Sequence, residues 1–335
     1  MVGIISYGAS LPALRLPATA YKEAWGACGA RGMVQKAFCA YDEDAVTLGI
    51  DAARSALGRL GKNQPAIDAL FFGVTAPPFD EKPSAATIAT ALFDYKNIRV
   101  TEISGSPQAG MQAITSAIEY CQSDKGRFAL AVAADAPIAP PDASFEHALG
   151  AAGAAFVIGP NGPVAEFLGC FSVTHETFGS RFRRRGEEMV SDLELRTRDN
   201  LLSIEELGKL TAISDVPKRM ALGVDAGLRR SVGRLLGNSE AIVDKIWTEI
   251  GDAAAAAAPC ALVATLDNMR TNQTVLAVGV GAGATAVAFR AGGGLSANRR
   301  KGKKFSELIE CGRVVNYIDY LKHKRLLSAR TGGKG

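Results

Sequence analysis

The sequence is poor in the residue patterns that build metal and redox sites. Its cysteines are Cys28, Cys39, Cys121, Cys170, Cys260 and Cys311. No two of them have a Cys-x-x-Cys spacing, and the three histidines are widely scattered. Zinc sites and dithiol redox sites rely on such closely spaced pairs. We therefore predict no metal site and expect free thiols.

The sequence also lacks the long apolar runs of membrane proteins. No run approaches the roughly 20 apolar residues that a spanning helix needs. Residues 1–8 contain no basic segment followed by an apolar one, so we expect no signal peptide. Together these absences predict a cytoplasmic protein that has no membrane contact.

A strong charge imbalance is absent as well, because the net charge is only +4. Basic residues cluster at Arg181, Arg183, Arg184 and Arg185, and again in residues 299–304. Aromatic residues do not alternate with them as on a nucleic-acid surface, so we expect no nucleic-acid partner. Two interpretations of the clusters remain open. They form a solvated or mobile surface, or they bind an acidic partner or phosphate groups.

The composition that is present is that of an ordinary globular protein. The 335 residues are 47% hydrophobic and 21% charged, which suits a fused two-lobe α/β unit. Apolar runs typical of buried strands occupy residues 2–7, 69–74, 98–103 and 128–134. Helical patterns occupy residues 42–60, 84–93 and the segment from about Pro107 onward. Strands that alternate with helices predict a parallel-type α/β sheet.

Polar residues mark the predicted helix starts. Asp42, Glu43 and Asp44 place negative charge on the first turn of one helix, where the helix dipole favours it. Ser84 is the predicted N-cap of the next helix, and Ser106 that of the helix after it.

Two similar glycine-rich segments suggest an internal duplication. Gly150–Gly159 and Val278–Phe289 both run from small residues into an apolar strand. We predict an N-terminal half over residues 1–160 and a C-terminal half over residues 161–292. Residues 293–335 are a predicted basic linker and tail, in which 305–327 carry apolar residues that must pack on this chain or on a partner.

Several motifs in combination carry a specific resemblance. They are Gly3–Pro12, Asp42–Leu57, Phe72–Phe79, Lys82–Ala85, Gly153–Gly159 and Gly279–Gly283. Together they resemble archaeal-type 3-hydroxy-3-methylglutaryl-CoA (HMG-CoA) synthases of the thiolase superfamily. The match extends to about residue 290 and is poor over residues 186–220. The resemblance implies an α/β thiolase fold, with duplicated βαβαβαββ halves in a five-layer α-β-α-β-α arrangement.

The resemblance also implies a Cys–Glu–His site, which this chain lacks. In the family the thiolate at a helix N-terminus accepts an acyl group, the glutamate moves a proton and the histidine supports the oxyanion. Pro107 stands at the cysteine position, Thr75 at the glutamate position and Leu222 at the histidine position. Asp252 replaces an asparagine of the family. We therefore predict no catalytic residue of the thiolase type.

The remaining polar candidates have simpler interpretations beside the catalytic ones. Ser106 is either a helix cap or a displaced nucleophile, and we favour the cap. His147 and His175 are expected to be surface or hydrogen-bonded polar residues. The Gly279–Gly283 stretch lacks the G-x-G-x-x-G spacing of a dinucleotide loop, so its glycines are expected to allow close approach of the backbone.

The resemblance is strongest to the synthase-like subunit of phloroglucinol acetyltransferase, which lacks the cysteine and has a C-terminal extension. It implies a non-catalytic subunit of a heteromeric acyltransferase or β-ketothiolase complex, in which residues 305–327 would serve assembly. The implied partners are a cysteine-bearing thiolase-like subunit and, as a further candidate, a small zinc-ribbon/OB-fold protein. A CoA thioester would bind in that complex.

Two alternatives remain open. The first is an active acyl-CoA condensing or acyl-transfer enzyme with a remodelled site that uses Ser106. The second is a CoA-binding module without turnover. In that module Arg181, Arg183, Arg184 and Arg185 would lie near the CoA phosphates.

Overall fold

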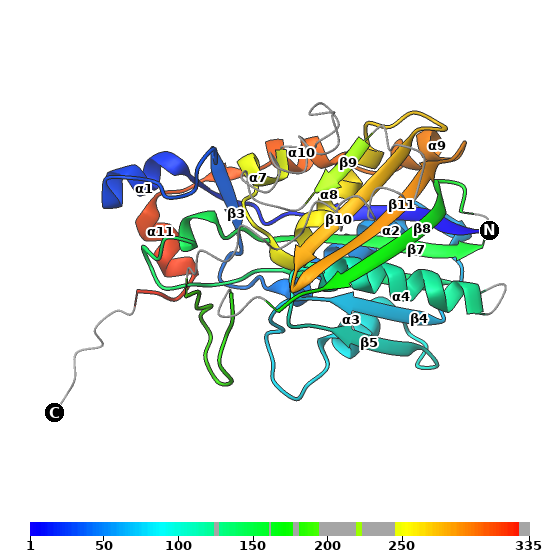
Figure 1. Ribbon diagram of the computed structural model, residues 1–335, viewed down its shortest axis with the longest axis horizontal. Helices are drawn as coiled ribbons and strands as arrows, with labels where there is room; N and C mark the ends of the chain where they lie inside the picture. The colour runs from blue at the N-terminus through cyan, green and yellow to red at the C-terminus, as the bar shows by residue number, and fades with distance from the viewer. Residues whose placement is uncertain (124–126, 161, 177–180, 194–218, 223–244, 328–335) are drawn as a thin grey trace.

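A single large sheet organises the protein (Figure 1). The computed structural model describes residues 1–123, 127–160, 162–176, 181–193, 219–222 and 245–327. The strands of the sheet are β1 (Val2–Ser10), β4 (Ala69–Gly73), β5 (Arg99–Ile103), β6 (Ala129–Asp135), β7 (Ala152–Pro160), β8 (Ala165–Thr174), β9 (Arg219–Leu222), β10 (Thr274–Gly281) and β11 (Gly283–Ala291). Their order is β5-β4-β6-β7-β1-β8-β11-β10-β9. All four apolar runs of the sequence are strands of this sheet.

The two halves of the sheet repeat one pattern of pairing. In the first half β4 and β6 are parallel, and β6, β7 and β1 follow as antiparallel neighbours. In the second half β9 and β10 are parallel, and β10, β11 and β8 follow as antiparallel neighbours. Gly150–Gly159 leads into β7, whereas Val278–Phe289 spans the turn between β10 and β11. The repeated pairing agrees with the duplicated fold that the resemblance implies.

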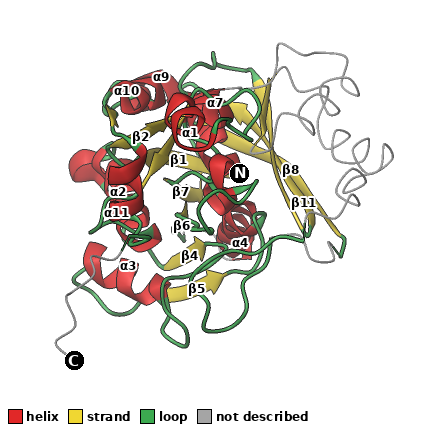
Figure 2. Cartoon of the chain, turned by 90° about the vertical axis from the view of Figure 1, so that its left-hand side faces the viewer, coloured by secondary structure: helices red, strands yellow, loops and turns green. Residues whose placement is uncertain are grey.

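Helices lie outside and between the two halves (Figure 2). Helices α2 (Ala45–Gly58) and α3 (Ser84–Leu92) cover one face of the first half, whereas α4 (Ala109–Ser123) and α8 (Ala257–Leu266) lie between the halves. Every residue of α8 is buried, as a helix covered on all sides requires. Residues 194–218 and 223–244 lie outside the described residues.

The helices begin one to three residues away from their predicted starts. Asp44 is the N-cap of α2 and forms a capping box with Thr47, so Asp42 and Glu43 precede the helix. Pro83 occupies the cap position of α3, and Ser84 is its first, fully buried residue. Helix α4 begins at Ala109 rather than near Pro107. Within the described stretches, no helix combines the length and the apolar character needed to cross a bilayer.

The segment predicted as a basic linker is folded against the protein. It forms α9 (Leu295–Arg299) and α10 (Phe305–Glu310). The Arg299 guanidinium donates to the carbonyls of Leu266 and Met269, both at 2.7 Å. The Phe305 N–H donates to the Asp267 carboxylate at 2.7 Å. These contacts tie the segment to the end of α8.

The apolar tail packs on this chain. It contains β12 (Arg313–Val314) and α11 (Tyr317–His323), and β12 pairs in parallel with β2 (Leu14–Pro17). Strand β3 (Gln35–Phe38) completes this three-stranded sheet. Tyr317, Tyr320 and Leu321 are buried in one cluster with Leu14 and Phe38. The remaining elements are α1 (Ala18–Trp25), η1 (Gly61–Asn63), η2 (Glu146–Ala148), α7 (Lys245–Glu249) and η5 (Ala254–Ala256).

A buried ion pair fixes α11 to the body. The Lys36 ammonium lies 2.8 Å from Glu146 Oε1, and neither side chain is exposed. The hydroxyls of Tyr21 and Tyr320 donate to the same oxygen. Burial lowers the pKa of Lys36 to about 8, against the opposing effect of Glu146. Because Tyr320 belongs to α11, the tail helps to close this polar site from water.

Candidate functional site

The three degenerate family positions surround the start of α4. The Thr75 carbonyl follows β4 and accepts a hydrogen bond from the Gly105 N–H at 3.1 Å, in the turn that carries Pro107. Leu222 ends β9 and pairs with β10. Strand β10 ends at Gly281, where an added Cβ would lie 3.0 Å from the Pro107 ring. The fold therefore brings Thr75 and Pro107 to one turn and places Leu222 on the strand beside β10, and none of the three residues carries a thiol, carboxylate or imidazole.

In the turn before α4, the hydroxyl oxygen of Ser106 already accepts hydrogen bonds from the backbone. Ser106 Oγ accepts hydrogen bonds from the Ala282 N–H at 3.0 Å and the Gln108 N–H at 3.4 Å. Gln108 is buried, and its Nε2 donates to the Ala282 carbonyl at 3.2 Å. Ser106 therefore caps the turn and joins it to the β10–β11 hairpin. The predicted role as N-cap is wrong in detail, because α4 begins three residues later, at Ala109.

Glycines allow the backbones around this turn to touch. A Cβ on Gly73 would lie 2.4 Å from the Ala109 carbonyl oxygen, and one on Gly281 would lie 2.2 Å from Ser106 Oγ. A Cβ on Gly110 would lie 1.9 Å from the Ala255 carbonyl oxygen. These distances confirm the interpretation of the Gly279–Gly283 stretch as one of close approach.

A buried carboxylate that the sequence analysis missed lies beside Thr75. Asp135, the last residue of β6, is 1% exposed, and its Oδ2 accepts from the N–H groups of Thr75 at 2.8 Å and Ala255 at 3.1 Å. Burial raises the pKa of Asp135, while hydrogen bonds from Thr75 and Ala255 and the charge of Arg181 oppose the rise. The only sequence signal was an acid at the end of the apolar run 128–134.

An ion pair occupies the position where the family keeps an asparagine. Arg181 Nη1 lies 2.5 Å from Asp252 Oδ2, and Asp252 Oδ1 accepts from the Ala254 N–H at 2.9 Å. The Arg181 side chain is only 15% exposed. One of the four candidate arginines for phosphate binding is thus turned inward, toward Asp252 and Asp135, with its charge matched by a carboxylate.

Comparisons with known proteins point to the same family that the sequence motifs resemble. No family model matches the chain. The HMG-CoA synthase of Thermococcus gammatolerans is 28% identical over 97% of this chain and 96% of its own length. That of Archaeoglobus fulgidus is 28% identical over 98% of this chain and all of its own length. The chain is thus similar to HMG-CoA synthases over nearly its whole length, which confirms the resemblance that its motifs indicated.

Solved structures show the same fold. An HMG-CoA synthase complexed with CoA has a TM-score of 0.82 at 14% identity, over 100% of this chain and 92% of that one. The HMG synthase of the curacin pathway, in complex with an acetyl donor-ACP, has a TM-score of 0.81 at 18% identity, over 96% and 87%. At these identities the likeness concerns the thiolase fold. The sheet and its layers in this HMG-CoA synthase-like chain are those of its structural neighbours.

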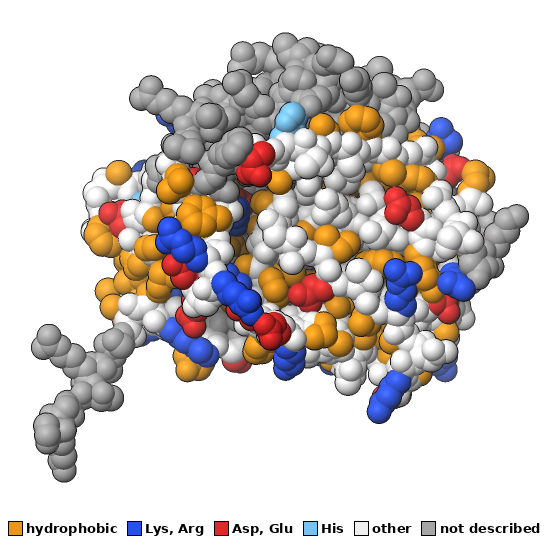
Figure 3. Space-filling view, turned by 60° about the horizontal axis from the view of Figure 1, so that its bottom comes forward, with side chains coloured by type: hydrophobic (Ala, Val, Ile, Leu, Met, Phe, Trp, Pro, Cys, Tyr) orange, Lys and Arg blue, Asp and Glu red, His pale blue; other side chains and the backbone are white. Residues whose placement is uncertain are grey.

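The other three arginines of the cluster lie on a loop near residues 77–81. Arg183 donates to the Pro77 carbonyl at 3.3 Å, Arg185 is paired with Glu81, and Arg184 lies 3.6 Å from Glu187. They line a pocket of about 320 Å³ together with Asp80 and Glu81. Basic and acidic side chains alternate on this face of the molecule (Figure 3). The carboxylates offset the positive charge that a phosphate would need.

The buried cysteines lack the environment of an acyl acceptor. All six are free, and Cys39, Cys121 and Cys260 are buried. Burial raises the pKa of Cys39 to about 12 and that of Cys121 to about 11, so these thiols stay protonated at neutral pH. Among the described residues, no three His, Cys, Asp or Glu side chains are grouped so that they could hold a metal ion.

The two candidate histidines have structural contacts. His147 is buried, accepts a hydrogen bond at Nδ1 from the Gly29 N–H at 2.9 Å and stacks on Tyr21 at a ring distance of 4.0 Å. Burial lowers its pKa. The backbone N–H of His175 donates to the Ala282 carbonyl at 3.3 Å. His147 therefore belongs to the cluster beneath α11 and not to the turn at Pro107.

Proposed function

We propose that this HMG-CoA synthase-like chain is the non-catalytic subunit of a heteromeric acyltransferase or thiolase complex. It supports a cysteine-bearing, thiolase-like partner. The observation that carries the proposal is the turn before α4, where Pro107 takes the place of the acyl-accepting cysteine. Proline has no nucleophilic atom, and backbone N–H groups occupy the acceptor positions of the adjacent Ser106 hydroxyl.

The charges around the turn support a structural role. The Asp135 carboxylate is held by backbone N–H groups, and Asp252 is held by Arg181. An acid or base that works in catalysis must exchange a proton with a bound substrate. Here the carboxylates are used to hold loops of this chain together. We assign CoA thioester binding to the complex and acyl transfer to the partner's cysteine.

The remaining features of the proposal concern the complex. The resemblance supports a small zinc-ribbon/OB-fold protein as a third component. The six free cysteines support a cytoplasmic setting, because disulfides persist in oxidising compartments.

The test has two measurements on the native protein. The tagged chain is purified from its host under native conditions, and the mass and composition of the assembly are determined. The assembly is then incubated with acetyl-CoA, and the intact mass of each chain is read. We expect a heteromer in which the partner's chain gains an acetyl group and this chain gains none.

A nucleophile at Ser106 would give the opposite result. The isolated chain would turn over acyl-CoA, carry an acyl group itself and lose both properties on Ser106→Ala. Ser123→Ala is the matched control, because that hydroxyl lies at the exposed end of α4 and donates only to the Tyr120 carbonyl. Turnover that survives in Ser123→Ala and disappears in Ser106→Ala would overturn the proposal.

A further inference from the structure

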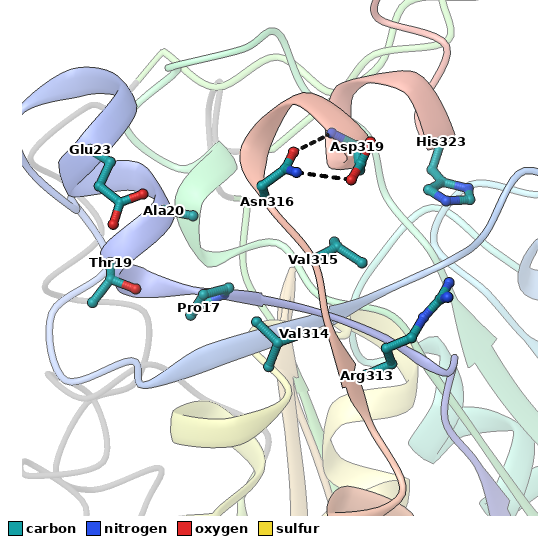
Figure 4. A pocket seen from close by; sticks show the side chains of 10 residues that line it. All are labelled: Pro17, Thr19, Ala20, Glu23, Arg313, Val314, Val315, Asn316, Asp319 and His323. Atoms are coloured by element: carbon teal, nitrogen blue, oxygen red, sulfur yellow. Dashed lines mark hydrogen bonds between the residues drawn. The ribbon is translucent and has the colours of Figure 1, made fainter.

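A groove lies between α1 and α11, away from the turn at Pro107 (Figure 4). Its volume is about 660 Å³. Pro17, Ala20 and the exposed Val314 supply apolar surface, and Val314 is 60% exposed. One wall of the groove is formed by β12 and the start of α11, and the other by α1.

One wall of the groove is a sheet edge with outward backbone groups. Strand β12 is the last strand of the three-stranded sheet in the described part of the chain. The N–H group of Arg313 donates to the carbonyl of Ala13, just before β2, at 2.7 Å, and that of Val315 donates to the carbonyl of Arg15 in β2 at 3.0 Å. Because successive residues of a strand face opposite sides, the N–H and C=O of Val314 face away from β2. They can pair with an added extended segment.

The charges in the groove are separated. Arg313 and His323 point toward each other at one end, and Glu23 lies at the opposite end (Figure 4). His323 Nδ1 accepts a hydrogen bond from the Tyr41 N–H at 3.2 Å, so the proton of the neutral ring lies on Nε2, which is a donor. The guanidinium and this N–H form a site for a carboxylate.

The nearby Asp319 is already engaged. Its carboxylate accepts from Asn316 Nδ2 at 2.9 Å and lies 3.4 Å from the Lys322 ammonium. Its backbone N–H is capped by Asn316 Oδ1 at 2.8 Å. Asp319 therefore opposes an anion less than a free carboxylate would.

The groove is built before any ligand arrives. Asn316 caps α11, Tyr317 and Tyr320 are buried beneath it, and β12 is held by its bonds to β2. A preformed site avoids the entropic cost of ordering its own walls when a flexible segment binds.

We propose that this groove binds the carboxyl-terminal segment of a partner polypeptide. The segment adds to the outer edge of β12, places an aliphatic side chain against Pro17 and Val314, and directs its terminal carboxylate to Arg313 and His323. A basic side chain of the segment faces Glu23. This site goes beyond the proposed function, since binding of such a tail does not depend on where acyl transfer occurs.

The occupant is chosen by charge and by backbone chemistry. A free small anion would use Arg313 and His323 but neither the apolar surface nor the edge of β12. An internal loop of a partner would use the edge but has no terminal carboxylate. A chain end supplies an apolar side chain, extended backbone and a carboxylate together in one short segment.

The experiment measures which peptides are retained by the immobilised full-length chain. Two random octapeptide libraries are compared, one with free carboxyl ends and one with amidated ends, and a peptide of residues 328–335 is tested beside them. We expect the free-carboxyl pool to be retained about tenfold more than the amidated pool, as for loss of one charge-assisted hydrogen-bond pair. The retained peptides should be enriched in an aliphatic and a basic residue.

Variants of the chain separate the parts of the site. Arg313→Gln should remove the preference for free carboxyl ends, and Val314→Pro should weaken both pools because it removes the outward N–H. Lys22→Gln removes an exposed positive charge outside the groove and should change nothing. Equal retention of both pools, or an unchanged preference in Arg313→Gln, would overturn the proposal. Strongest binding by the 328–335 peptide would overturn it in favour of a second copy of this chain.

Discussion

At the residue scale, one carboxylate collects an unusual number of donors. Glu146 Oε1 accepts from Lys36, Tyr21 and Tyr320, while Oε2 is buried without a hydrogen-bond partner. Burial raises the pKa of Glu146, but the Lys36 ammonium and the three hydrogen bonds outweigh it, so the pKa lies below its ordinary value. Removal of either partner of the Lys36–Glu146 pair would leave the other charge buried without a counter-charge, which is strongly destabilising.

Removing the cation should therefore be costly. We predict that Lys36→Met lowers the free energy of unfolding by about 3–5 kcal/mol, because it leaves Glu146 charged and buried. Urea unfolding measures this loss. Lys322→Met, on the exposed face of α11, should cost less than about 1 kcal/mol. The double variant Lys36→Met/Glu146→Gln should recover part of the loss, and equal losses in both lysine variants would contradict the argument.

The Lys36–Glu146 pair also predicts that the stability of the folded protein depends on pH. Because the pKa of Glu146 is lower in the folded protein than its ordinary 4.5, its stabilising contribution is complete above that value and is lost as pH falls through the folded-state pKa. The difference in urea midpoint between the wild type and Glu146→Gln should be largest at neutral pH and shrink in acid. A difference that is constant with pH would exclude this linkage.

At the scale of elements, the first turn of α4 depends on the absence of side chains. Gly73, Gly110 and Gly281 allow β4, η5 and the β10–β11 hairpin to reach the turn at Pro107. In an active relative such contacts would shape a substrate site. Here they close the backbone around Pro107.

Two glycines in helices provide a matched test of this packing. Gly110→Ala would place a Cβ 1.9 Å from the Ala255 carbonyl oxygen, so we predict a loss of about 3 kcal/mol or more. A Cβ on Gly58, the last residue of α2, would meet nothing within 4 Å. Gly58→Ala should raise stability by about 0.5–1 kcal/mol through helix propensity. Thermal unfolding of both variants measures these changes in stability. A Gly110→Ala protein as stable as the wild type would show that η5 can move.

At the scale of the whole molecule, the C-terminal segment is part of the fold. Arg59 Nη2 donates to the Lys303 carbonyl at 2.7 Å, and Arg15 Nη2 donates to the Leu308 carbonyl at 3.2 Å. Both arginines are 1% exposed. The segment thus supplies partners for cations that lie deep in the N-terminal half.

Deletion of residues 305–335 should therefore destabilise the entire chain. It would uncover the Lys36–Glu146 pair and remove one hydrogen-bond partner each from Arg15 and Asp267. We predict poor soluble yield and, in the soluble fraction, a midpoint of thermal unfolding at least about 10 °C lower by circular dichroism. If the truncated chain unfolded at the same temperature as the full chain, the tail would not contribute to the stability of the fold.

Local patterns in the sequence were enough to predict the fold class and to support the proposal that thiolase chemistry is lost. Apolar runs and helical periodicity are short-range features, so strands such as 69–73 and 129–135 were predicted closely. The prediction that Pro107 replaces a nucleophile likewise depends on a single residue. Helix starts were less accurate, because several polar residues in a row, such as Asp42 to Asp44, can each serve as a cap.

Tertiary structure alone decided what the remaining polar residues do. Arg181 was predicted as a surface cation, but folding carries it to Asp252, 71 positions away along the chain. Asp135 finds its donors on Thr75 and Ala255, and Tyr320 of the tail meets Glu146. Sequence patterns report which residues are apolar and at what period. The partner of a buried charge depends on distant segments that only the packed sheet and its layers bring together.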